Sequence, residues 1–124
     1  MKLTTYVPLC LIGSAQAAYI TNLGMCQFKS SGGAAYAAAA KFCKPANIDW
    51  TSDYAKKGVV ATGPHGSKAR AYITHGACEP GTPSVDSTDC LMQMMWACRK
   101  GDTHGYGTVR GSGGGCLTFG IASS

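Results

Sequence analysis

Cysteine content constrains this chain more than any other feature, because seven cysteines occur in 124 residues. An odd number cannot pair completely within one chain, so either one thiol stays free or one cysteine is removed. None of the seven belongs to a Cys-x-x-Cys pair, which argues against a structural zinc site. The three histidines also lack the spacing of metal ligands, and we expect neither a metal nor another cofactor.

Residues 1–17 have the pattern of a secretory signal peptide. Lys2 precedes a short apolar stretch, residues 6–13, and Ser14-Ala15-Gln16-Ala17 supplies small residues for cleavage. Cys10 would leave with this segment, and six cysteines would remain: Cys26, Cys43, Cys78, Cys90, Cys98 and Cys116. Six cysteines in an exported chain indicate three disulfides, with the connectivity open. We therefore expect one secreted, extracellular, cysteine-rich domain over residues 18–124, acting as a monomer.

The remaining chain alternates strand-like and helix-like runs. Expected strands cover residues 18–23, 57–62, 68–74, 106–110 and 116–121, and expected helices cover 34–43 and 86–100. The turn formers of residues 63–67 and the glycines of 111–115 should close two hairpins. The order β-α-β-β-α-β-β predicts an α+β fold, a small disulfide-stapled sandwich with two helices on an antiparallel sheet.

The second expected helix has the clearest boundaries. It begins at Asp86 or Ser87, and Arg99-Lys100-Gly101 supplies the basic residues and glycine of a helix end. Leu91, Met94, Met95 and Cys98 follow the spacing of a buried helix face. Met92 and Trp96 form a second apolar row, which either belongs to the core or makes an exposed contact patch.

Groups capable of acid–base chemistry are sparse. Asp49 and Asp53, four residues apart, are either an acid–base pair or polar residues of a connecting loop. All three histidines, His65, His75 and His104, precede glycine. His75 with Glu79 and Arg70 would supply the groups of a small secreted ribonuclease or other hydrolase if they converged. A small secreted enzyme of this kind is the alternative to the hypothesis that the protein acts without catalysis.

Basic residues and tryptophans are the candidates for surface contact. The candidate residues are Lys56, Lys57, Lys68, Arg70 and Trp96. The four basic ones lie on or beside the first expected hairpin, where they would face an anionic membrane or cell-wall surface or simply protect a sheet edge. Trp50 or Trp96 could also serve as the stacking platform of a carbohydrate-binding or inhibitor module. No nucleic-acid partner is expected.

Two short stretches carry a resemblance to known families. Asp89-Cys90 at the start of a helix and residues 115–121 as the last strand are similar to Ecp-type necrosis-inducing effector domains of filamentous fungi. Leu23-Gly24-Met25-Cys26 and the order of elements resemble the killer toxins of smut fungi, which have more disulfides. The resemblance implies a secreted virulence effector or toxin that acts on a host or competitor cell without catalysis. No catalytic residue carries over.

Overall fold

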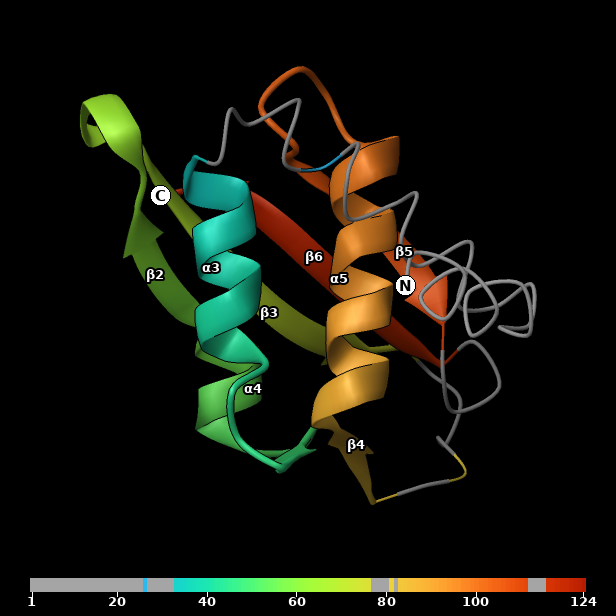
Figure 1. Ribbon diagram of the computed structural model, residues 1–124. Coiled ribbons are helices and arrows are strands. Elements are labelled where there is room, and N and C mark those ends of the chain that lie inside the picture. Colours follow the sequence, from blue (N-terminus) through green and yellow to red (C-terminus); the bar gives the residue numbers. More distant parts are fainter. Residues whose placement is uncertain (1–25, 27–32, 77–80, 82, 112–115) are drawn as a thin grey trace, which may run out of the picture.

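The computed structural model describes residues 26, 33–76, 81, 83–111 and 116–124. These residues form an α+β fold in which helices α3 (Ala34–Phe42) and α5 (Ser87–Lys100) pack against a four-stranded antiparallel sheet (Figure 1). The strands of this sheet are β2 (Val59–Thr62), β3 (Lys68–His75), β5 (Gly107–Gly111) and β6 (Leu117–Ser123). The predicted fold class is confirmed. Expected segments 1–17 and 18–23 lie outside the described residues.

The strand order in the sheet is β2-β3-β6-β5, so that β3 and β6 form its centre. Both expected hairpins are present: Val60 pairs with Arg70 in the first, and Val109 pairs with Phe119 in the second. The hairpins join where β3 runs antiparallel to β6, with Ala71 opposite Ile121. Side chains alternate between the two faces of a strand. The odd-numbered residues of β3 and β6 therefore share one face, and the even-numbered residues share the other.

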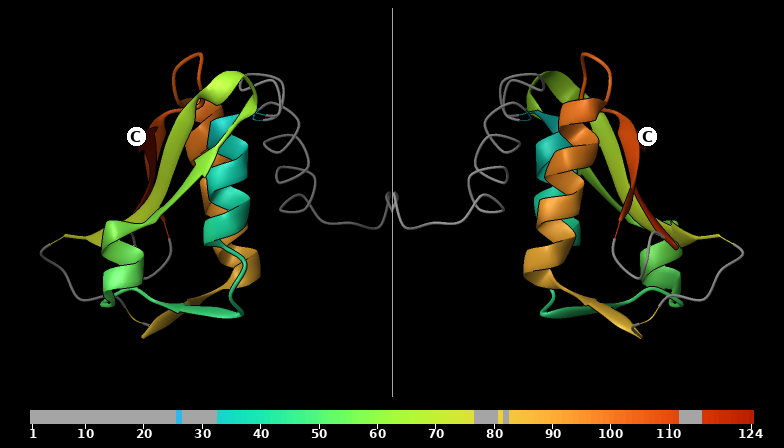
Figure 2. Two further views of the ribbon diagram at one scale, coloured as in Figure 1. Left: turned by 90° about the vertical axis from the view of Figure 1, so that its left-hand side faces the viewer. Right: turned by 90° about the vertical axis from the view of Figure 1, so that its right-hand side faces the viewer.

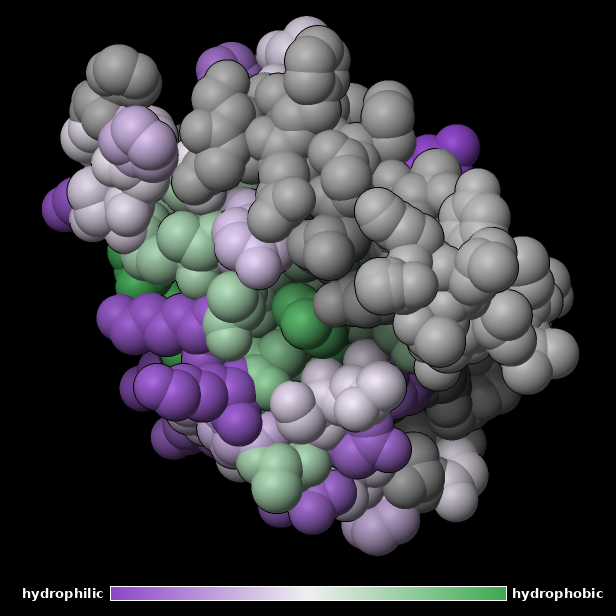
Figure 3. Space-filling model, in the orientation of Figure 1, coloured by the Kyte–Doolittle hydropathy of each residue, from purple (hydrophilic) through white to green (hydrophobic). Residues whose placement is uncertain are grey.

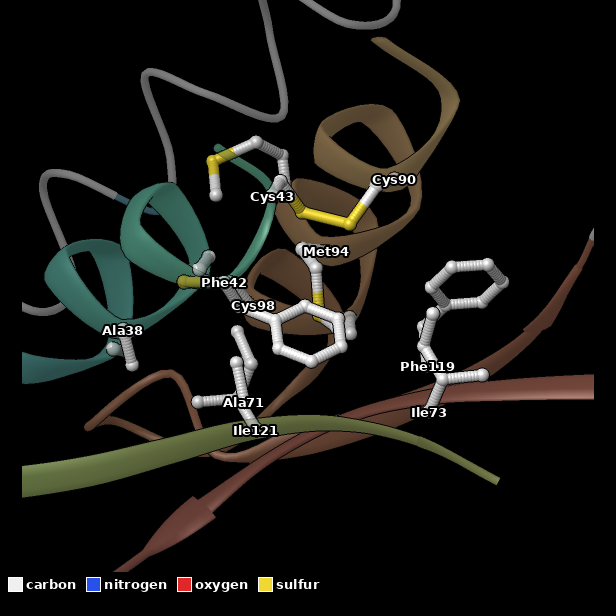
Figure 4. Close-up of a cluster of buried hydrophobic side chains, with 14 of the residues drawn as sticks. Ala38, Phe42, Cys43, Ala71, Ile73, Cys90, Met94, Cys98, Phe119 and Ile121 are labelled. Carbon is white, nitrogen blue, oxygen red and sulfur yellow. A yellow bond between two sulfur atoms is a disulfide. The ribbon is translucent and has the colours of Figure 1, made fainter. Parts of the chain in front are cut away.

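The odd-numbered face is covered by α3 and α5 (Figure 2). Ile73 and Phe119, which are paired across β3 and β6, are completely buried under the helices. Met94 of α5 and Phe42 of α3 close this core from the other side (Figure 4). On β3 the small side chain of Ala71 leaves room for the alanine-rich face of α3 to approach the sheet.

Helix α5 has the boundaries that its sequence predicts. The Asp86 side chain caps the helix by accepting a hydrogen bond from the Asp89 backbone N–H at 2.7 Å. Arg99 and Lys100 occupy the last turn, and Gly101 follows it. Met94, Met95 and Cys98 are buried as expected. Trp96 lies on the exposed side of the helix, with 38% of its surface accessible.

Two disulfides connect the helices to each other and to the preceding chain. Cys43, immediately after α3, is bonded to Cys90 in the first turn of α5 (Figure 4). Cys26 is bonded to Cys98 near the other end of α5. Cys116 also belongs to a disulfide, and its partner lies outside the described residues, as does the expected disulfide residue Cys78. Cross-links over such long loops stabilise a small domain chiefly by restricting its unfolded state.

Three short elements were not expected from the sequence. Strands β1 (Asn47–Asp49) and β4 (Ser84–Asp86) pair as a second, two-stranded antiparallel sheet. Helix α4 (Asp53–Lys57) lies between β1 and β2, where a connecting loop was one expectation. Ser52 caps α4, with its hydroxyl accepting from the Ala55 backbone N–H at 3.2 Å. The turn that was expected at residues 63–67 contains a 3₁₀ turn (Pro64–Gly66), which connects β2 to β3.

Candidate functional surface

The even-numbered face of the four-stranded sheet is not covered by α3 or α5, and we call it the open face (Figure 2). Lys68, Thr74 and Arg110 are exposed on it, and Arg70 and Tyr72 are half-buried. Strand register places further side chains on the same face: Val60, Thr62, Thr108, Thr118, Gly120 and Ala122. The open face is thus a surface of basic, hydroxyl, aromatic and small residues on an antiparallel sheet.

Tyr72 lies flat at the centre of the open face. Its register partner is Gly120 on β6, and a Cβ atom placed on Gly120 would lie only 2.3 Å from Cζ of the tyrosine. The absence of a side chain at Gly120 therefore allows the ring to rest on β6. The Arg70 guanidinium lies over the ring, 4.4 Å from its centroid, in a cation–π contact. The Tyr72 ring thus has contacts with both Gly120 and Arg70.

The charge of the open face has a single sign. Lys68, Arg70 and Arg110 lie on it, and register places no described aspartate or glutamate there. The described aspartates all belong to other parts of the molecule: Asp49, Asp53, Asp86, Asp89 and Asp102. An exposed face that carries cationic side chains and no described acidic side chain attracts anions over about one Debye length, roughly 8–10 Å at physiological salt.

The four basic residues predicted for surface contact fall at one side of the sheet. Arg70 donates a hydrogen bond from Nη1 to the backbone oxygen of Lys57 at 3.0 Å. Lys56 and Lys57 are exposed in the last turn of α4, next to the start of β2, and Lys68 is exposed at the start of β3. The structure thus brings Lys57 and Arg70 into contact and places Lys68 on the same face as Arg70.

Trp96 does not belong to this group. It lies on α5, which packs on the covered face of the sheet, and the Lys100 ammonium lies 5.1 Å from its ring centroid. The helix side of the molecule also carries apolar surface over α3, bordered by hydrophilic side chains (Figure 3). Trp50 is only 8% exposed, so its use as a surface stacking platform is a wrong prediction. Its ring packs edge-on against His75, with 4.8 Å between centroids.

The structure separates the described groups of the hydrolase hypothesis. His75 is at the end of β3, where it pairs with Leu117, and its Nδ1 lies 2.9 Å from the backbone oxygen of Gly76. Arg70 points onto the open face, whereas His75 has the register of the covered face. Glu79 and the side chain of His65 lie outside the described residues.

His104 belongs to the turn between α5 and β5, far from His75. It stacks on Tyr106 with 5.4 Å between ring centroids, and Asp102 accepts hydrogen bonds from two backbone N–H groups of the turn. Gly107, at the start of β5, pairs with Ile121 of β6, whereas His75 pairs with Leu117, four residues earlier on the same strand. This separation corresponds to about 13 Å along the strand. The two described histidines therefore face different ends of the sheet.

Asp49 and Asp53 serve local structure. Asp49 Oδ1 accepts hydrogen bonds from the hydroxyl of Thr51 at 2.6 Å and from its backbone N–H at 2.8 Å. These bonds, the hydroxyl first, lower the pKa of Asp49 below its ordinary value because they stabilise the carboxylate. Asp53 begins α4, where a negative charge favours the helix dipole. A general acid would need the opposite pKa shift at Asp49.

Within the described part of the chain, no group of three or more histidine, cysteine, aspartate or glutamate residues is arranged to hold a metal ion. Over the same residues, no helix combines the length and apolar character needed to cross a membrane.

Comparisons with protein-family models, curated proteins and solved structures find no match to this chain. The resemblance to fungal effectors and killer toxins is therefore still a prediction that depends on the short stretches quoted above.

The sequence reasoning missed Arg110, Tyr72 and the threonines as members of one surface. A signal for part of it was present, because residues 68–74 alternate Lys, Arg, Tyr and Thr with Ala, Ala and Ile. This alternation predicts a strand with one apolar and one polar face. Arg110 could not be assigned to that face, since its position depends on the pairing of β5 with β6 and of β6 with β3.

Proposed function

We propose that the protein is a secreted effector or toxin-like protein of the fungal type, which acts without catalysis by binding to a host or competitor cell. One observation carries this proposal: a sheet face that α3 and α5 leave uncovered presents three cations and no described aspartate or glutamate on a disulfide-linked domain. Of the described groups of the hydrolase hypothesis, His75 and Arg70 belong to opposite faces of β3.

Disulfides support action outside the producing cell. Bonds such as Cys43–Cys90 form and persist in oxidising compartments and are rare in the cytosol. A domain of this size that works outside cells must also resist proteases, which cleave locally or globally unfolded chain. Disulfides that close long loops lower the population of such open states. Both arguments agree with the signal-peptide pattern of residues 1–17.

The test is to apply purified, oxidised protein comprising residues 18–124 to plant leaves and, separately, to fungal and bacterial cultures. We expect cell death or growth arrest in one class of recipient at micromolar concentration, and no effect from protein that has been reduced and alkylated. A matched assay should measure RNA cleavage by the same preparation and by His75→Ala. Absence of any effect on all recipients, or RNA cleavage that is lost in His75→Ala, would overturn the proposal.

A further inference from the structure

The cations of the open face form an extended row. Arg70 follows Lys68 by two residues on β3, and Arg110 lies two strands away on β5, in the row of Thr74 and Thr118. From the spacing within and between strands, Lys68 and Arg110 are about 20 Å apart. A small anion cannot contact both ends of such a row. Its geometry fits an extended ligand that carries several negative charges.

The neutral groups of the open face show which kind of extended anion fits. Threonines surround the cations: Thr62, Thr74 and Thr108 are exposed and Thr118 is half-buried. Their hydroxyl groups can both donate and accept hydrogen bonds, as the hydroxyl groups of sugars can. Thr74 and Thr118 are direct partners across β3 and β6, and Arg110 is the next residue of that row. Hydroxyls and a guanidinium are thus presented side by side.

The aromatic group of the face argues against nucleic acid. Single-stranded nucleic acids bind with their bases stacked on free aromatic faces. Tyr72 is the only aromatic residue that register places on the open face of the described strands, and its ring is occupied by Gly120 beneath and Arg70 above. A base would have to displace the guanidinium to stack there. A chain of carboxylated sugars needs no such displacement.

We propose that the open face binds an acidic polysaccharide of the recipient's surface, a linear chain of uronic-acid-type sugars. Carboxylates of the chain pair with Lys68, Arg70 and Arg110, and sugar hydroxyls hydrogen-bond to the threonines between them. This inference rests on the proposed function and names the class of surface ligand that the protein recognises. Guanidinium groups are well suited to this role because they bind carboxylates through two parallel hydrogen bonds.

The experiment measures binding of the oxidised protein to polygalacturonate at low and high salt, with fully methyl-esterified polygalacturonate and single-stranded DNA as comparison ligands. The main variant is Lys68→Gln/Arg110→Gln, which removes two cations whose side chains are exposed on the open face. The matched control, Lys44→Gln/Lys100→Gln, removes the same charge from exposed residues that are outside the sheet. Circular dichroism of each variant verifies folding.

We expect the main variant to bind polygalacturonate roughly fivefold more weakly, as two exposed ion pairs are lost, and the control to change less than twofold. The wild-type affinity should fall with salt and be absent for the esterified polymer. Equal weakening by both variants, or tighter binding to DNA than to polygalacturonate, would overturn the proposal. Cell death or growth arrest that persists without polygalacturonate binding would reject this ligand and leave the proposed function in place.

Discussion

The two faces of the four-stranded sheet differ in almost every property although they share the same strands. The covered face of β3 and β6 carries Ile73, Leu117 and Phe119, all completely buried. The open face of the same strands carries basic, hydroxyl and aromatic side chains, none of which is fully buried. The buried residue of this face is Gly120, which lies against Tyr72. One strand therefore supplies alternate residues to the buried core and to the open face. Substitutions on the open face should therefore cost the fold less than substitutions on the covered face.

Exchanging neighbouring residues of β6 should reveal this difference most strongly. Phe119→Ala would leave a cavity among the buried side chains and lower the free energy of unfolding by about 4 kcal/mol. Thr118→Ala, one residue away on the open face, should change it by less than about 0.5 kcal/mol. Urea denaturation of both variants measures the two values. Similar losses in both would mean that the faces do not divide their roles.

Removing a disulfide should weaken the helix side selectively. Cys43→Ala/Cys90→Ala deletes the bond between the end of α3 and the start of α5 and should cost about 2–4 kcal/mol, mainly through greater freedom of the unfolded chain. Native-state hydrogen exchange should speed up first in the last turn of α3, while amides of the β3–β6 pair stay the slowest. A uniform acceleration over both regions would show that the sheet depends on this cross-link as much as the helices do.

Much of this arrangement could be predicted from the sequence, and the reasons are local. The boundaries of α5 were predicted correctly because the cap, the terminal charges and the final glycine all act within a few residues. The same signals exist at α4, in Ser52, Asp53, Lys56, Lys57 and Gly58, but five residues are too few for a visible apolar period. Neither β1 nor β4 has more than three residues, and each exists only through pairing with the other.

The candidate surface was less predictable than the fold. Lys68 and Arg70 could be placed on one face by the period of two. Their relation to Arg110 depends on strand order, since β6 lies between β3 and β5. The position of Tyr72 depends on meeting a glycine across the strand pair. Such non-local pairings are not determined by any short stretch of sequence. They bring residues of β3 and β5 that are far apart in the sequence onto one surface.

The contact between Tyr72 and Gly120 gives a smaller test confined to the open face. Gly120→Ala would place a methyl group against the tip of the Tyr72 ring, which must swing away. Because the tip of the ring is the far end of a half-buried side chain, which can move aside, we expect a loss of no more than about 1 kcal/mol. A double-mutant cycle with Tyr72→Ala measures the coupling. Coupling near zero would show that the ring does not rest on Gly120 in solution.

The smallest effect concerns acid sensitivity at a carboxylate away from the open face, on which register places no described aspartate or glutamate. Asp49 lies in β1, outside the four-stranded sheet. Its pKa is lowered first by the hydrogen bond from the Thr51 hydroxyl and then by the one from the Thr51 backbone N–H. A carboxyl whose pKa is lower in the folded state stabilises the fold above its unfolded pKa, ordinarily 3.8. That contribution disappears as the pH falls through the folded pKa.

Asp49→Asn should therefore reduce stability slightly at neutral pH and by less as the pH drops below 3.8, so the wild-type and variant unfolding curves converge in acid. Asp53→Asn, which also removes a carboxylate next to α4, is the control for general charge effects. Thermal unfolding between pH 2 and pH 7 measures both. A constant difference between wild type and Asp49→Asn over this range would show that the bonds to Thr51 do not depend on the charge of Asp49.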